Sequence, residues 1–90
     1  MASYKLVIKR SAAKEIESIG LKKTRQRVVE RIRGLAENPR PHGCEKLSGR
    51  HSRYRVRQGP FRILYEIKDD ELIVYVVRVA DRRDVYKRLT

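Results

Sequence analysis

Four arginines lie within one short stretch of the sequence, "SRYRVRQGPFRILYEI" at residues 52–67. They are Arg53, Arg55, Arg57 and Arg62. In an extended strand the first three project from one face, because successive side chains alternate between the two faces of a sheet. Arg62 follows a turn at Gly59-Pro60 and points away from its apolar neighbours. We therefore expect it to join the same surface.

The guanidinium group of arginine is planar and matches the oxygens of a phosphate, so a row of arginines suits the backbone of RNA or DNA. Like charges placed side by side on a sheet cost up to about 1 kcal/mol for each opposed pair. Thr or Gln would face solvent at a lower cost, which favours a ligand-binding role for the row. The alternative is a solvated edge strand whose positive charge prevents aggregation.

Further candidates lie near the end of the sequence and in the loop before the arginine stretch. Arg82 and Arg83 stand close to Tyr86, a combination that suits an RNA backbone with an aromatic ring to stack on a base. Of the two histidines, both in the loop, His51 is the better candidate for an RNA contact.

The sequence predicts no metal site. His42 and Cys44 have the spacing of two ligands, but no other cysteine exists to complete a zinc site. Asp69, Asp70 and Glu71 cluster in a predicted turn, whereas a two-metal site needs carboxylates that converge in a cleft. We therefore expect neither a metal ion nor another cofactor.

Length and charge restrict the class of protein. The chain has 90 residues, with 23 Lys and Arg against 11 Asp and Glu, for a net charge of +12. We expect a single domain over residues 1–90, with a polyanionic partner: nucleic acid first, an acidic protein second. The longest apolar run, "LIVYVV" at 72–77, is too short to cross a membrane, and no export signal precedes it. With one cysteine there is no internal disulfide, which suits the cytoplasm.

Periodicity predicts an α+β fold. An N-terminal strand precedes a two-helix hairpin, which packs on one face of a small, mainly antiparallel four-stranded sheet, and a short C-terminal helix ends the chain. Most basic residues of the second helix are expected to form a solvated face. The expected elements are a strand at 4–9, a helix capped by Ser11 and ended by Gly20, a helix at 21–37 ended by Asn38-Pro39, strands at 53–58, 61–68 and 72–80, and a helix within "DRRDVYKRL" at 81–89.

This order of elements resembles the RelE/ParE superfamily of bacterial and archaeal toxins over nearly the whole chain. The resemblance is carried by "KLSG", "YRVRQGPFRILYEI" and "VADRRDVY", and their spacing is similar to that of the RelE branch. Members of that branch are ribosome-dependent mRNA endonucleases of toxin–antitoxin pairs. The resemblance therefore implies a RelE-like fold and a mRNA-cleaving activity.

The resemblance also implies roles for particular residues. Arg62 matches the arginine that stabilises the phosphate, and Arg55 and Arg57 stand where relatives often carry lysines that contact the RNA backbone. Arg82 and Tyr86 match the terminal pair associated with proton transfer and base stacking. Arginine is a poor proton donor or acceptor, so Arg55 and Arg57 are expected to hold charge rather than move protons. Further RNA contacts are expected from Arg53, Arg83, His51 and Lys46.

Three functions remain open at this stage. The first is metal-independent cleavage of mRNA, in which the 2′-hydroxyl of the RNA attacks the phosphodiester. The second is the ParE-like alternative, inhibition of DNA gyrase without nuclease activity. The third is a non-catalytic basic module that binds RNA. For a toxin we expect a cognate antitoxin in a heteromeric complex, the ribosome and mRNA as further partners, and no contact with a membrane.

Overall fold

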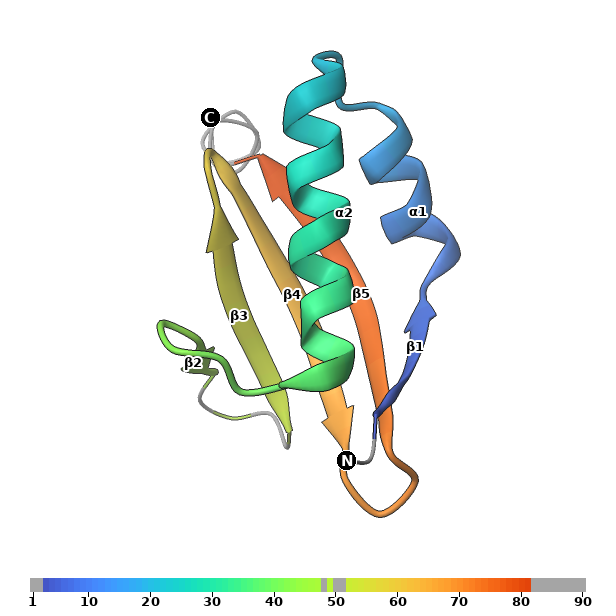
Figure 1. Cartoon of the computed structure of the whole chain (residues 1–90), viewed down its shortest axis with the longest axis vertical. Coiled ribbons are helices and arrows are strands. Elements are labelled where there is room, and N and C mark those ends of the chain that lie inside the picture. Colours follow the sequence, from blue (N-terminus) through green and yellow to red (C-terminus); the bar gives the residue numbers. More distant parts are fainter. Residues whose placement is uncertain (1–2, 48, 50–51, 82–90) are drawn as a thin grey trace.

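The computed structural model describes residues 3–47, 49 and 52–81, and shows two helices lying on one face of a five-stranded sheet (Figure 1). The predicted α+β class is confirmed. The predicted C-terminal helix falls almost entirely within residues 82–90, outside the described part of the chain. The elements are β1 (Lys5–Ile8), α1 (Arg10–Glu17), α2 (Lys22–Glu37), β2 (Glu45–Lys46), β3 (Arg53–Gln58), β4 (Phe61–Lys68) and β5 (Ile73–Asp81).

The strands lie in the order β1-β5-β4-β3-β2. β1 pairs with β5 in parallel, and every other neighbouring pair is antiparallel. The apolar last strand therefore lies in the interior of the sheet, between β1 and β4, as its composition predicts. The sheet has one strand more than expected, because Glu45 and Lys46 pair with Arg55 and Tyr54. This short strand was not predicted, because two residues in a loop rich in Pro and Gly are too few to show the alternation of side chains that marks a strand.

The core lies between the helices and one face of the sheet. α1 buries Ala12 and Ile16, as their helical spacing predicts, and α2 buries three residues of its own. The opposing residues of the sheet include Ile63, Tyr65, Val74 and Val76. Because both helices cover the same face, side chains of the opposite parity on β3 and β4 project from the other side of the sheet.

The first helix begins earlier than the sequence predicts. Ser11 was expected to cap it, but the N-cap is Lys9, whose side chain makes no capping hydrogen bond. The N–H of Ala13 donates to the carbonyl of Lys9 at 2.9 Å, which places Ser11 within the first turn. The predicted end of α2 is confirmed, because Asn38 has the extended ψ of 94° that a following proline favours.

α1 also covers part of a strand edge. β1 ends at Ile8, in register with Val76, so within the described part of the chain no strand pairs with this edge of β5 beyond that point. The carboxylate of Glu15 accepts a hydrogen bond from the N–H of Val79 at 2.9 Å and lies 3.6 Å from the Nε of Arg78. This contact satisfies a backbone donor that would otherwise invite pairing with another chain.

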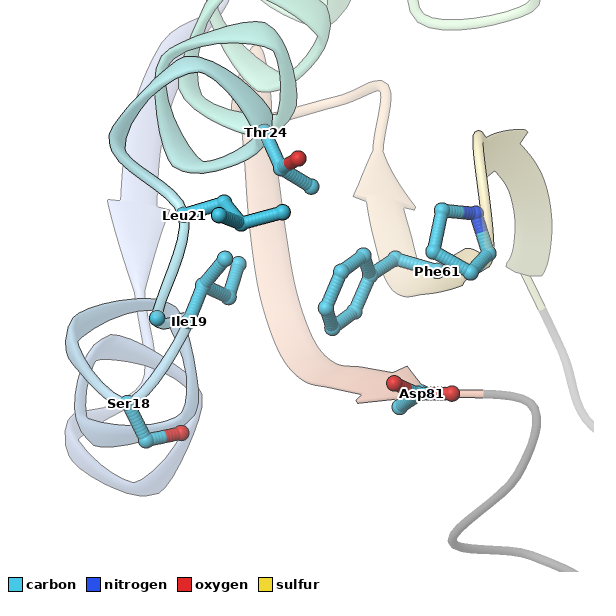
Figure 2. A pocket seen from close by; sticks show the side chains of 8 residues that line it. Ser18, Ile19, Leu21, Thr24, Phe61 and Asp81 are labelled. Carbon is cyan, nitrogen blue, oxygen red and sulfur yellow. The ribbon is translucent and has the colours of Figure 1, made fainter.

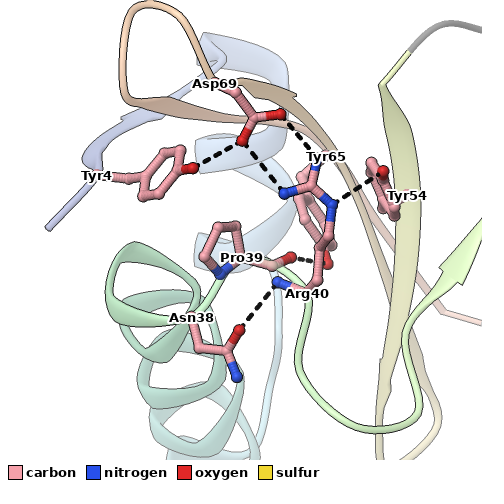
Figure 3. Close-up of polar contacts among 7 residues, drawn as sticks. All are labelled: Tyr4, Asn38, Pro39, Arg40, Tyr54, Tyr65 and Asp69. Carbon is pink, nitrogen blue, oxygen red and sulfur yellow. Dashed lines mark hydrogen bonds and ion pairs between the residues drawn. The ribbon is translucent and has the colours of Figure 1, made fainter. Parts of the chain in front are cut away.

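A polar cluster centred on Arg40 ties the loop after α2 to the turn between β4 and β5 (Figure 3). The two Nη atoms of Arg40 donate to the Asp69 carboxylate at 3.2 and 2.8 Å, and the hydroxyl of Tyr4 donates to the same carboxylate at 2.7 Å. The Arg40 guanidinium also lies 5.2 Å from the ring centre of Tyr54. Beneath it, the hydroxyl of Tyr65 donates to the carbonyl of Pro39 at 2.7 Å.

This cluster predicts a contribution to stability that depends on pH. The hydrogen bonds from Arg40, and then from Tyr4, lower the pKa of Asp69 to about 2. A carboxyl group whose pKa is depressed by folding stabilises the fold fully above its unfolded pKa of about 3.9, and the contribution is lost as the pH falls through the folded value. Asp69→Asn should therefore lower the melting temperature at pH 6, and its difference from the wild type should shrink between pH 4 and pH 2.

The measurement is thermal unfolding followed by circular dichroism across this pH range. Asp70→Asn is the matched control, because Asp70 lies in the same turn and makes none of these hydrogen bonds. A difference between Asp69→Asn and the wild type that stays constant from pH 6 to pH 2 would contradict the assigned role.

Candidate nucleic-acid interface

The arginine face is the side of the sheet turned away from the helices, and Arg53, Arg55, Arg57 and Arg62 define it. Tyr54 and Val56, between the arginines of β3, are only 8% and 1% exposed and pack into the core. The register across the hairpin places Arg57 directly opposite Arg62. The shared face that the alternation predicts is therefore confirmed.

A two-residue turn sets this register. Gly59 and Pro60 connect β3 to β4, and Gly59 has a φ of 59°, in the left-handed region that glycine adopts without steric cost. Gln58 and Phe61 form the first facing pair and Arg57 and Arg62 the second. Facing residues of an antiparallel pair have Cβ atoms about 4.5–5.5 Å apart. Two arginine side chains that start at this spacing are long enough to reach one phosphate together.

The four arginines fall into two classes by their partners. Arg53 Nη2 donates to Glu66 Oε2 at 2.5 Å, and Arg55 forms an ion pair with Glu45. Among the described residues, Arg57 and Arg62 have no acidic partner. The Nε atoms of Arg62 and Arg53 are both buried without a hydrogen-bond acceptor within this part of the chain, and of these two residues only Arg62 also lacks an acidic partner there. A buried donor without an acceptor is costly, and a phosphate oxygen would satisfy it.

The other predicted site residues are not brought to this face by the described part of the chain. Arg82, Arg83, Tyr86 and His51 lie outside the described residues. Lys46 is in register with Tyr54, whose side chain packs towards the helices, so Lys46 does not share the face of Arg53, Arg55 and Arg57. Sequence reasoning missed Glu45 and Glu66, the two acidic partners.

The basic residues of α2 belong to a different surface. Lys22, Lys23, Arg27 and Arg33 are exposed on the helical layer, which covers the opposite side of the sheet (Figure 1). They therefore add to the net positive charge of the protein without joining the arginine face.

A cleft of about 270 Å³ lies at the same end of the molecule as the Gly59-Pro60 turn (Figure 2). It is formed where the connection between α1 and α2 approaches the end of the β3–β4 hairpin, and Leu21 at its rim is 72% exposed. None of the four arginines lines it, so this cleft is separate from the arginine face. Its lining residues are Ser18, Ile19, Gly20, Leu21, Thr24, Pro60, Phe61 and Asp81.

The described residues contain neither a candidate metal site nor a candidate membrane span. Within residues 3–47, 49 and 52–81, no three His, Cys, Asp or Glu side chains gather in a way that could hold a metal ion. In that same part of the chain, neither helix has the length and apolar character needed to span a membrane.

The sequence matches known toxins along most of its length. Residues 6–86 match the family model described as the ParE toxin of the type II toxin–antitoxin system parDE. A protein of Escherichia coli that carries the provisional description of a RelE-like toxin is 30% identical over 87 residues, which cover 92% of this chain and 90% of that protein.

Solved structures share the fold. The E. coli RelBE toxin–antitoxin complex contains a chain with a TM-score of 0.75 and 26% identity, covering 88% of this chain and 96% of that one. The archaeal RelE–RelB complex of Pyrococcus horikoshii gives a TM-score of 0.79 at 24% identity, covering 89% and 96% of the two chains. The fold, with two helices on one face of the sheet, and the match over residues 6–86 agree with each other. The chain therefore belongs to the RelE/ParE superfamily of type II toxin–antitoxin toxins, in its RelE-like branch.

Proposed function

We propose that this toxin is a ribosome-dependent endonuclease that cleaves mRNA without a metal ion. The observation that carries the proposal is the pair formed by Arg57 and Arg62, which face each other across the hairpin and have no acidic partner among the described residues. Two opposed cations that lack an acidic partner in the described part of the chain suit a ligand that brings several anionic oxygens, and the buried Nε of Arg62 lacks an acceptor there as well.

The reaction needs little from the protein besides charge and position. RNA carries its own nucleophile, the 2′-hydroxyl, which attacks the adjacent phosphorus while the 5′-oxygen of the next nucleotide leaves. Charge develops on the oxygens of the pentacoordinate phosphate, and stabilising that charge is the largest contribution to phosphoryl transfer. Arg62 and Arg57 are the best-placed residues for this role.

Proton transfer is assigned to the end of the chain. In this proposal Tyr86 is the base that takes the proton of the 2′-hydroxyl, the positive charge of Arg82 assists it, and solvent water protonates the leaving 5′-oxygen. The roles of Tyr86 and Arg82 rest on the resemblance of "VADRRDVY" to the RelE branch. Arginine is a poor proton donor or acceptor, so Arg57 and Arg62 contribute positive charge to the transition state rather than proton transfer.

An antitoxin partner follows from the relatives and from the charge. The structures of the P. horikoshii and E. coli relatives are complexes of toxin with antitoxin. We infer that this chain, with a net charge of +12, is neutralised by a cognate antitoxin whose acidic and apolar segment binds it. The toxin would act in the cytoplasm, on translating ribosomes.

A direct test is to induce the chain alone in cells and map the 5′ ends of message fragments. We expect new ends within translated codons, and none in untranslated regions of the same messages. Arg62→Ala induced to the same level is the control for degradation by host nucleases. Fragment ends that do not depend on translation would contradict ribosome-dependent cleavage.

Inhibition of DNA gyrase is the second candidate, because the matching family model describes the ParE toxin. The same purified protein can be added to a DNA supercoiling assay. A ParE-like toxin blocks supercoiling and leaves mRNA intact, whereas the proposed endonuclease cuts ribosome-bound message and leaves supercoiling unchanged.

A further inference from the structure

Two of the four arginines on the arginine face are paired with a carboxylate. Glu66 lies on β4 directly opposite Arg53, and their side chains are 28% and 30% exposed. Glu45 lies on β2 directly opposite Arg55, and its side chain is 65% exposed. Each carboxylate thus holds an arginine that would otherwise be available to a phosphate.

The two ion pairs differ in how firmly they are held. Glu66 belongs to β4, where it pairs with Arg53 of β3 on one side and with Tyr75 of β5 on the other, so its backbone is held firmly beside Arg53. Glu45 belongs to a strand of two residues at the edge of the sheet. Exposed ion pairs of this kind contribute little to stability. The contact between Glu45 and Arg55 is therefore the one that a ligand can displace.

Arg55 is placed where a second phosphate would arrive. It lies two residues from Arg57 on the same face of β3, a distance of roughly 7 Å along the strand. An RNA strand held by Arg57 and Arg62 can therefore bring a neighbouring phosphate to Arg55. Phosphate binds a guanidinium group through two parallel hydrogen bonds, as a carboxylate does, and so competes directly with Glu45.

We propose that Glu45 is an internal competitor for RNA phosphate at Arg55. In the free protein Glu45 neutralises Arg55, and when RNA occupies the arginine face the phosphate displaces the Glu45 carboxylate. Glu45 thereby lowers the affinity of the arginine face for RNA in general and leaves Arg57 and Arg62 as the primary contacts. This inference rests on the proposed function, because it assumes that RNA binds the arginine face.

The test measures binding of a fluorescently labelled single-stranded RNA, about 12 nucleotides long, by fluorescence anisotropy. Glu45→Gln should tighten binding about three- to tenfold, because Arg55 becomes free for a phosphate and a repelling carboxylate is removed. Glu71→Gln is the matched control: it changes the net charge equally but lies in the exposed turn between β4 and β5. The control should change affinity less than about twofold, since its charge is screened at physiological salt.

A double-mutant cycle separates this mechanism from a general gain of charge. In an Arg55→Gln background, Glu45→Gln should lose most of its effect on RNA affinity, because the arginine it would release is absent. The slope of log affinity against log salt concentration should be steeper for Glu45→Gln than for the double variant that also carries Arg55→Gln. The expected difference is about 0.7, the value for one phosphate contact on a single strand. Glu45→Ala removes the same carboxylate and should behave like Glu45→Gln.

Two results would overturn the inference. One is an equal gain in affinity from Glu45→Gln and Glu71→Gln, and the other is an undiminished gain in the Arg55→Gln background. Neither result bears on the proposed function, which is judged by the effect of Arg62→Ala on cleavage of ribosome-bound mRNA.

Discussion

Arg62→Ala should reduce cleavage of ribosome-bound mRNA by about 100- to 1,000-fold, the usual cost of removing one donor that stabilises charge in a transition state. In cells the same change should abolish growth arrest. The expected loss is large because Arg62 has no acidic partner among the described residues, and the buried Nε donor has no acceptor there. Arg62→Lys should keep the charge but lose the planar fork, and so recover only part of the activity.

Stability measurements separate this effect from misfolding. Replacing Arg62 removes a like charge that faces Arg57 across the hairpin, so the melting temperature should stay close to that of the wild type. Arg33→Ala is the matched control, because it removes the same charge from the exposed surface of α2 and should leave cleavage unchanged. Growth arrest that persists with folded Arg62→Ala protein would remove Arg62 from the site.

Naked RNA should be cleaved at least about 1,000-fold more slowly than the same message on a ribosome. Positioning of the reacting groups supplies up to about 7–11 kcal/mol in favourable cases, and the ribosome would supply it here by holding the mRNA in a fixed conformation. None of the four arginines lines the cleft beside the hairpin turn, so this cleft does not fix the orientation of RNA on the arginine face. A flexible RNA would therefore bind it in many orientations, few of them reactive.

The comparison uses one labelled message, free and in a programmed ribosome, with purified toxin in excess. Arg62→Ala protein prepared in parallel measures the background from contaminating nucleases. Equal single-turnover rates on the two substrates would show that the protein alone orients the RNA, and the proposed dependence on the ribosome would be wrong.

The β3–β4 hairpin could be predicted from the sequence to the residue. Arg53–Gln58 and Phe61–Lys68 alternate with a period of two, and Gly59-Pro60 between them fixes a two-residue turn. That turn also determines the register, so the pairs of Arg57 with Arg62 and of Arg53 with Glu66 were both available from the sequence. Glu66 was not among the residues singled out in the sequence, so the second pair was missed.

The contact between Glu45 and Arg55 could not be predicted in the same way. β2 has only two residues and follows a loop, so no local pattern states which residues of β3 it will face. The start of α1 was misplaced for a related reason. Serine is preferred at the N-cap because its side chain accepts a hydrogen bond there, but in this helix the backbone carbonyl of Lys9 accepts the first helical hydrogen bond, two residues earlier in the chain than a cap at Ser11 would place it. Long-range and backbone contacts decide both cases.

The parallel pairing of β1 with β5 has a consequence for the order of synthesis. Lys5–Ile8 leave the ribosome first of all the described strands, yet they pair only with Ile73–Val76, which are made after every other element. Until then β4 also lacks its neighbour, and the hydrophobic face of the sheet is incomplete. A nascent chain therefore cannot complete the sheet that carries its arginine face until the codons for Ile73–Val76 have been translated.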